Sequence, residues 1–163
     1  LAGRCPDASI VGVDRAPAMV ALASRRARRA GRGDLRFVVG DALDLPFAAA
    51  SFDGAYSLAS LKHWPDRERG LAELHRVLRP GAEALVVEAD GEASPAAVAA
   101  HARRWPWIPA AVFTALFRGL VARAGLGPRA ARGLARRSPF AASELVVWPE
   151  LPFVGLRLIK GGA

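Results

Sequence analysis

The sequence has one cysteine and no long apolar run, and these two shortages exclude several classes of protein. Cys5 alone cannot form an intramolecular disulfide, which excludes a disulfide-rich secreted scaffold and a cysteine-rich zinc site. The most apolar stretch, 105–121, contains two prolines and an arginine, so we expect no membrane span. No signal peptide is recognisable, and a bacterial-type cytoplasm is the expected location. The 163 residues suffice for one domain with one core.

Positive charge is concentrated in the C-terminal half. The net charge is +8, and residues 91–163 carry ten basic but only three acidic side chains. Such a segment can attract nucleic acid, anionic lipid or an acidic substrate. The sequence has neither an RNA-binding motif of aromatic residues and glycines nor helix-turn-helix spacing. A solvated arginine-rich surface is therefore the favoured interpretation, with no nucleic-acid partner.

Short apolar runs alternate with helical patterns over the first ninety residues. Helices are expected from Pro17 to the glycines at 31 and 33, and after Asp66, with an inner face at Leu71, Leu74, Val77 and Leu78. Strands are expected at 9–13, 35–39, 52–57 and 84–87. This alternation is typical of an α/β fold with a mostly parallel sheet.

The remaining chain has a different pattern. Helices are expected at 98–104 and 110–124, as a helical lid or flank. The aromatic residues there are expected to pack in the core or, alternatively, to line a pocket for an apolar molecule; they are Trp105, Trp107, Phe113 and Phe117. The runs 144–148 and 153–159 are joined by so short a link that they should be antiparallel neighbours.

Two carboxylates end successive predicted strands. Asp14 closes the first strand, and Asp41 follows the second with Gly40 beside it. At the carboxyl edge of a nucleotide-binding sheet, such an acid accepts hydrogen bonds from ribose hydroxyls. The alternative is an ordinary turn or helix-capping aspartate, which explains one such residue more readily than two.

Six short motifs in order give the sequence a specific resemblance. They are 13–19 (VDRAPAM), 39–42 (VGDA), 45–47 (LPF), 51–53 (SFD), 61–66 (LKHWPD) and 76–81 (RVLRPG). Together they resemble the motifs of class I S-adenosylmethionine-dependent methyltransferases that act on small molecules, over about residues 5–90. The resemblance implies a single Rossmann-like domain over 1–163. Its parts would be a cofactor-binding part (1–90), a helical lid or flank (91–137) and a terminal strand pair (138–163).

The resemblance also implies roles for individual residues toward S-adenosylmethionine. Asp14 would bind the ribose hydroxyls, and Arg15 and Met19 would flank the adenine. Asp41 would accept a hydrogen bond from the adenine amino group, with the amide of Ala42 beside the ring.

Further along the chain, Ser57 and Leu58 would lie along the methionine portion of the cofactor. Lys62 and His63 occupy a pair that is often two histidines in this group, so Lys62 is a departure, although it remains a candidate cofactor contact. His63 is the candidate general base. A packing or cofactor-edge role is favoured for it, because a sulfonium is already an excellent leaving group. No metal site is expected from three scattered histidines.

The family's first strand and glycine-rich loop have no counterpart in this sequence. Residues 1–4 resemble the last turn of the helix that follows that loop, and we expect an N-terminally incomplete product that binds the cofactor weakly or not at all. The expected function is methyl transfer to a small, partly apolar acceptor. The alternative is a degenerate, non-catalytic binding domain. A nicotinamide-dependent oxidoreductase fits less well, because it does not account for the motifs at 45–53 and 76–81.

Overall fold

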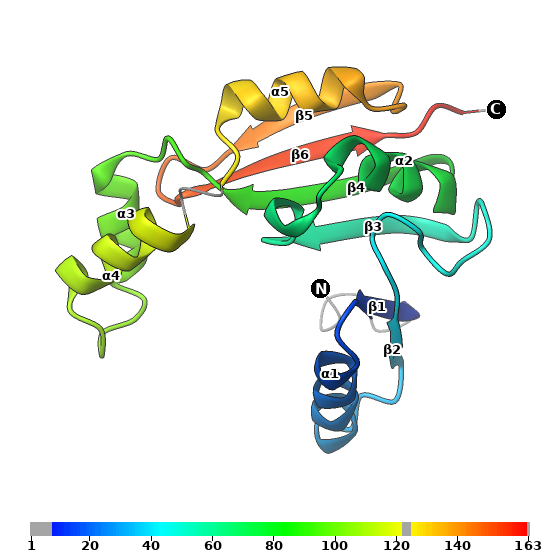
Figure 1. Ribbon diagram of the computed structural model, residues 1–163, viewed down its shortest axis with the longest axis horizontal. Helices are drawn as coiled ribbons and strands as arrows, with labels where there is room; N and C mark the ends of the chain where they lie inside the picture. The colour runs from blue at the N-terminus through cyan, green and yellow to red at the C-terminus, as the bar shows by residue number, and fades with distance from the viewer. Residues whose placement is uncertain (1–7, 122–124, 163) are drawn as a thin grey trace. The chain divides into compact units, whose positions relative to one another are not determined.

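The computed structural model describes residues 8–121 and 125–162. Contacts divide the chain into two units, Leu1–Pro46 and Phe47–Ala163, which are described in turn (Figure 1).

The first unit is a strand–helix–strand arrangement. Strand β1 (Ile10–Asp14) leads through helix α1 (Pro17–Arg29) to strand β2 (Leu35–Val39). The two strands are parallel, with Asp14 opposite Val39, and α1 supplies the crossover that parallel pairing requires. Both strands were predicted, the first with a boundary one residue earlier.

Helix α1 exposes most of its side chains. It begins at Pro17, as expected, and Ala27 is its buried residue. Met19, the residue expected beside an adenine, is 51% exposed. It lies in the first turn of the helix, where its side chain is accessible to a ligand.

The second unit is built on a four-stranded sheet in the order β3-β4-β6-β5. Strand β3 (Phe52–Leu58) runs parallel to β4 (Leu78–Ala89), and β6 (Phe153–Ile159) is antiparallel to both β4 and β5 (Ala142–Val147). The antiparallel terminal pair is therefore confirmed. Leu78, expected on a helix, instead starts β4, because it pairs with Phe52 and becomes fully buried.

Helices α2 (Arg67–Val77) and α5 (Pro128–Arg137) pack on this sheet. The core between these helices and the sheet consists mainly of leucine side chains, including Leu71, Leu134, Leu156 and Leu158. Helix α5, the last part of the segment expected to be a helical lid or flank, packs its apolar residues against β5 and β6. Asp66 caps α2 as predicted, accepting a hydrogen bond from the amide of Arg69 at 2.9 Å.

Helices α3 (Pro95–Ala102) and α4 (Ala110–Leu116) pack against each other, and a π-helical turn, η2 (Phe117–Val121), follows. Phe117 is buried with Ala89 and Val98, and Phe113 packs against this cluster. Trp105 and Trp107 are 42% and 71% exposed, so the expectation of core packing is wrong for them. They lie on the turn between α3 and α4, which contains two prolines. No helix in the described ranges has the length and apolarity to cross a membrane.

Candidate functional site

Asp14 ends β1 with an exposed side chain. Its Oδ1 accepts a hydrogen bond from the amide of Ala16 at 2.8 Å, which forms the turn into α1. Its carbonyl oxygen accepts a hydrogen bond from the amide of Gly40 at 3.1 Å, which continues the pairing with the chain leaving β2. Within residues 8–121 and 125–162, Oδ2 has no protein partner, so half of the carboxylate can still accept hydrogen bonds.

Asp41 lies just beyond the carboxyl end of the neighbouring strand. Its Oδ1 accepts a hydrogen bond from the amide of Leu43 at 3.0 Å. Its Oδ2 lies 3.5 Å from Nε of Arg15, and both side chains are substantially exposed. Gly40 is tightly packed, since a Cβ there would lie 2.9 Å from Cδ of Pro46. The two predicted carboxylates therefore occupy the same end of the two-stranded sheet, linked through the residue that follows Asp14.

At the carboxyl end of β3, Ser57 and Leu58 differ in environment. Leu58 is 65% exposed. Ser57 is partly buried, and its Oγ is shielded from solvent without a hydrogen-bond partner in the described chain. A shielded hydroxyl without a partner is unfavourable in a folded protein. A polar group of a ligand could satisfy this hydroxyl.

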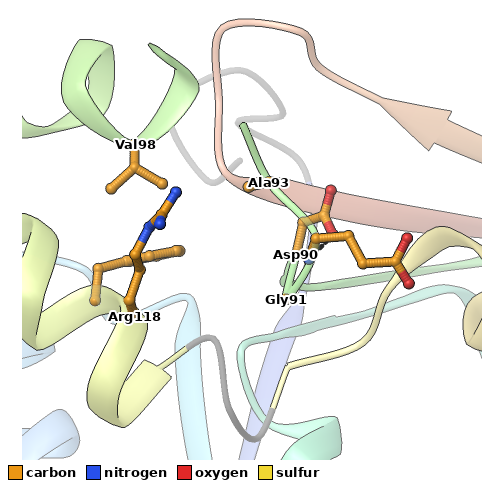
Figure 2. A pocket seen from close by; sticks show the side chains of 7 residues that line it. Asp90, Gly91, Ala93, Val98 and Arg118 are labelled. Atoms are coloured by element: carbon orange, nitrogen blue, oxygen red, sulfur yellow. Dashed lines mark hydrogen bonds between the residues drawn. The ribbon is translucent and has the colours of Figure 1, made fainter. Parts of the chain in front are cut away.

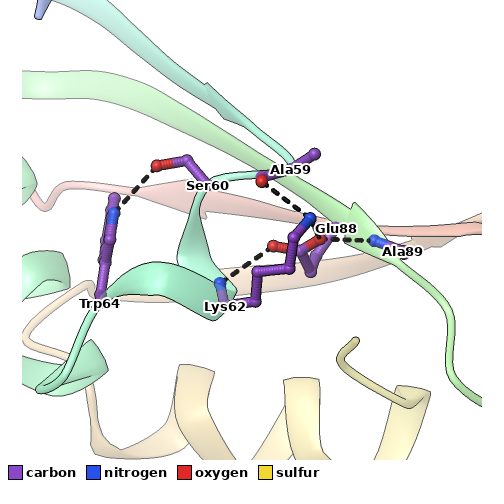
Figure 3. A network of polar contacts seen from close by, with 6 residues as sticks. All are labelled: Ala59, Ser60, Lys62, Trp64, Glu88 and Ala89. Atoms are coloured by element: carbon purple, nitrogen blue, oxygen red, sulfur yellow. Dashed lines mark hydrogen bonds and ion pairs between the residues drawn. The ribbon is translucent and has the colours of Figure 1, made fainter. Parts of the chain in front are cut away.

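Lys62 lies in a short 3-10 helix, η1 (Leu61–His63), and forms a buried ion pair with Glu88 near the end of β4 (Figure 3). Its Nζ is 3.2 Å from Oε1 of Glu88 and also donates to the carbonyl of Ala59 at 3.0 Å. Its backbone amide donates to Oε2 at 3.1 Å. Glu88 is only 1% exposed and also accepts a hydrogen bond from the amide of Ala89. These contacts attach the segment after β3 to the end of β4.

Sequence reasoning missed Glu88. The residue reads locally as a charge at the end of a strand, and its partner is 26 positions away. The unusual lysine at position 62 was the available signal, because a cation on a segment beside a sheet needs an acidic partner when it is buried. His63, the candidate general base, is exposed at the end of η1.

A hollow of about 330 Å³ lies within the second unit (Figure 2). The loop after β4 forms one side, and Val98 with Arg118 forms the other. Its lining residues are Asp90, Gly91, Glu92, Ala93, Val98, Phe117 and Arg118. Of the four aromatic residues predicted as a possible pocket lining, only Phe117 contributes.

Comparison with known proteins agrees with this arrangement. A family model described as a methyltransferase domain matches residues 1–86, more than half of the chain. The chain is 42% identical over 85 residues to a demethylmenaquinone methyltransferase of Thermus thermophilus, covering 52% of this chain and 38% of that protein. It is 40% identical over 83 residues to O-methyltransferase cnsE of Penicillium expansum, covering 50% of this chain and 30% of that protein.

A solved structure shows the same fold over a larger part of the chain. The crystal structure of a SAM dependent methyltransferase from Aquifex aeolicus superposes with a TM-score of 0.71 at 12% identity, covering 93% of this chain and 68% of that one. The chain spans less than two fifths of the length of the two curated relatives. With the family model, the ordered motifs and the strand-end carboxylates in agreement, the chain belongs to the class I S-adenosylmethionine-dependent methyltransferases.

Proposed function

We propose that this chain belongs to an enzyme that transfers a methyl group from S-adenosylmethionine to a small molecule. The observation that carries the proposal is the pair of carboxylates at the carboxyl ends of β1 and β2, inside the segment that matches the family. Ligands of open α/β sheets bind at this edge.

Asp14 is proposed to bind the ribose. Its exposed Oδ2 can accept a hydrogen bond from a ribose hydroxyl while Oδ1 keeps the turn at Ala16 in place. A charge-assisted hydrogen bond of this kind is stronger than a neutral one.

Asp41 is proposed to accept a hydrogen bond from the adenine amino group, with the amide of Ala42 directed at the ring. Arg15 already contacts Asp41 and would stay beside the adenine. The exposed Met19 would cover the ring with a flexible apolar side chain.

Ser57 and Leu58 are proposed to contact the methionine portion, because the Ser57 hydroxyl has no hydrogen-bond partner among the residues that the structure describes. When bound, S-adenosylmethionine supplies an electrophilic methyl group whose departure leaves a neutral thioether. Orientation of the acceptor can then provide most of the rate acceleration. We therefore assign His63 a place at the edge of the site, and Lys62 the role of holding η1 through Glu88.

We further propose that the family's first strand and glycine-rich loop are not among these 163 residues. The first described strand is the one that ends in the ribose-binding acid, and no glycine-rich loop precedes it in the sequence. Without the amides of that loop we expect weak cofactor binding. The division of one domain into parts 1–90, 91–137 and 138–163 stays a prediction.

The proposed acceptor is a small, partly apolar molecule. Two relatives support this, because one is named for demethylmenaquinone and the other is an O-methyltransferase. The hollow beside Phe117 and Val98 combines apolar walls with the polar side chains of Asp90 and Arg118, which suits an acceptor with both kinds of surface.

The test is an NMR titration of the ¹⁵N-labelled chain with S-adenosylhomocysteine, which detects millimolar binding. Amides near Asp14 and Ala42 should shift, and Asp14→Ala should weaken binding by roughly 1.5–3 kcal/mol. Asp44→Ala removes a neighbouring exposed carboxylate and serves as the matched control. Equal affinity in the two variants would exclude Asp14 from the site. Shifts confined to other parts of the chain, with none near Asp14 and Ala42, would contradict the proposed cofactor site.

A further inference from the structure

The segment that joins α3 to η2 exposes an unusual amount of apolar surface. Ten large apolar side chains are exposed in the described residues, and four of them lie between positions 105 and 116. We define the hairpin tip as these four residues: Trp105, Trp107, Val112 and Leu116. Exposed apolar surface concentrated in this way marks a binding surface more often than chance.

The local structure explains why these side chains are exposed. Helix α4 directs Phe113 toward His101, with ring centroids 5.7 Å apart, and Phe117 is buried in the cluster with Val98. Val112 and Leu116 are four positions apart on the same helix, so they lie together on a different side. None of the residues of α4 is buried. The two tryptophans contact each other edge to face at 5.4 Å.

Positive charge accompanies this apolar surface. Residues 93–143 contain eight arginines and no acidic residue. Three exposed arginines are adjacent to the hairpin tip in the chain, namely Arg103, Arg104 and Arg118. Within the described ranges none of these three forms an ion pair, so their charge is available to a partner.

We propose that the hairpin tip and its three arginines bind the surface of an anionic lipid bilayer. Tryptophan favours the interface between headgroups and acyl chains, and short aliphatic side chains can enter the same layer. Arginine attracts the lipid phosphates at that depth. Exposed apolar side chains and exposed arginines therefore occur together in one short segment, residues 103–118.

Other partners explain less of this surface. Nucleic acid would use the arginines and could stack on the tryptophans, but it offers no counterpart to Val112 and Leu116. A stable protein interface buries about 800 Å² on each partner. Helix α4 has only seven residues and is roughly 10 Å long, which is small for such an interface. A lipid surface requires no such area and no matching shape.

The experiment is co-sedimentation of the full chain with vesicles. One set is phosphatidylcholine alone, and the other contains equal parts of phosphatidylcholine and phosphatidylglycerol. We expect binding to the anionic vesicles that decreases with added salt. Arg103→Gln, Arg104→Gln and Arg118→Gln should each weaken it by about fivefold. Trp105→Ser and Trp107→Ser should each weaken it by roughly tenfold or more.

A matched pair of variants controls for general effects of polarity. Val112 and Val147 are both 49% exposed, but only Val112 belongs to the hairpin tip. Val112→Thr should weaken vesicle binding, and Val147→Thr should leave it unchanged. Because all the substituted residues are exposed, the unfolding midpoints of the variants should match the wild type.

Three results would overturn the proposal. They are equal binding to the two vesicle sets, unchanged binding of the tryptophan variants, and displacement of the protein from vesicles by an equimolar oligonucleotide. None of these readouts depends on the cofactor, so the outcome is independent of the proposed methyl transfer.

Discussion

Lys62 and Glu88 form a buried ion pair in the second unit, with Nζ and Oε1 3.2 Å apart. The same carboxylate also accepts a hydrogen bond from the backbone amide of Lys62. The pair therefore fixes the position of η1 relative to β4 through both the side chain and the main chain. The effect of this pair on stability can be measured directly.

Breaking this pair on one side should destabilise the protein strongly. Lys62→Met leaves a carboxylate that is 2% exposed without its cation, and Glu88→Leu leaves the ammonium without its anion. We expect each to lower the free energy of unfolding by about 3–5 kcal/mol. The double variant Lys62→Met/Glu88→Leu should lose less free energy of unfolding than the sum of the losses in the two single variants. Urea unfolding of all four proteins measures the coupling, and strict additivity would show that the pair contributes nothing.

Gly70 should tolerate no larger side chain. It lies on α2, where a Cβ would overlap the ring of Trp64, and that indole donates a hydrogen bond to Oγ of Ser60 at 3.0 Å. Gly70→Ala should therefore destabilise the protein by about 1–3 kcal/mol despite the better helix propensity of alanine. Gly133→Ala on α5 is the control, because a Cβ there would meet only the flexible end of Arg137 among the described side chains. Thermal unfolding should show a lower midpoint for Gly70→Ala and a higher midpoint for Gly133→Ala than for the wild type.

Stability should fall on mild acidification. Burial, reinforced by Lys160, lowers the pKa of His75, and burial, reinforced by Arg104, lowers the pKa of His101. As the pH falls, these two histidines therefore take up protons in the unfolded chain before they do so in the folded protein. The stability that the neutral histidines contribute is complete above about pH 6.5. It decreases as the pH falls through that value toward the lowered pKa. Urea midpoints at about pH 7.5 and about pH 5.5 test this.

Substitution separates these histidines from other titrating groups. His75→Leu/His101→Leu should flatten the dependence of the urea midpoint between the two pH values. If the urea midpoint of the double variant changes with pH as much as that of the wild type, the pH dependence comes from other titrating groups.

The cap of α2 should contribute measurably to stability. Asp66 accepts the amide hydrogen bond of Arg69, and removing it leaves that donor without its cap. Asp66→Ala should lower the free energy of unfolding by about 0.5–2 kcal/mol. Asp66→Asn should keep most of the stability that the cap provides, because asparagine is also a good N-cap residue. Chemical denaturation is the measurement. Equal losses for alanine and asparagine would contradict a capping role.

This cap also illustrates what the sequence alone could predict. Asp66, the strand at 35–39 and the antiparallel pair of terminal strands depend on short-range signals, and the structure confirms them. The acids at positions 14 and 41 likewise follow directly from strand ends, and the structure brings them to one end of a sheet.

Features that depend on distant residues were not predicted. Leu78 continues a helical pattern, but pairing with Phe52 draws it into a strand. The aromatic character of Trp105 and Trp107 suggested a core position, although nothing in their own segment determines whether another element covers them. Glu88 could be found only once β4 and η1 were known to be neighbours.

The edge of β3 that faces away from β4 has no strand partner among the described residues. Such an edge offers its amides and carbonyls to any extended chain, including another copy of the same protein. Purification at high concentration should therefore favour intermolecular strand addition, and a lysine or proline placed along that border would be a practical way to keep samples monodisperse.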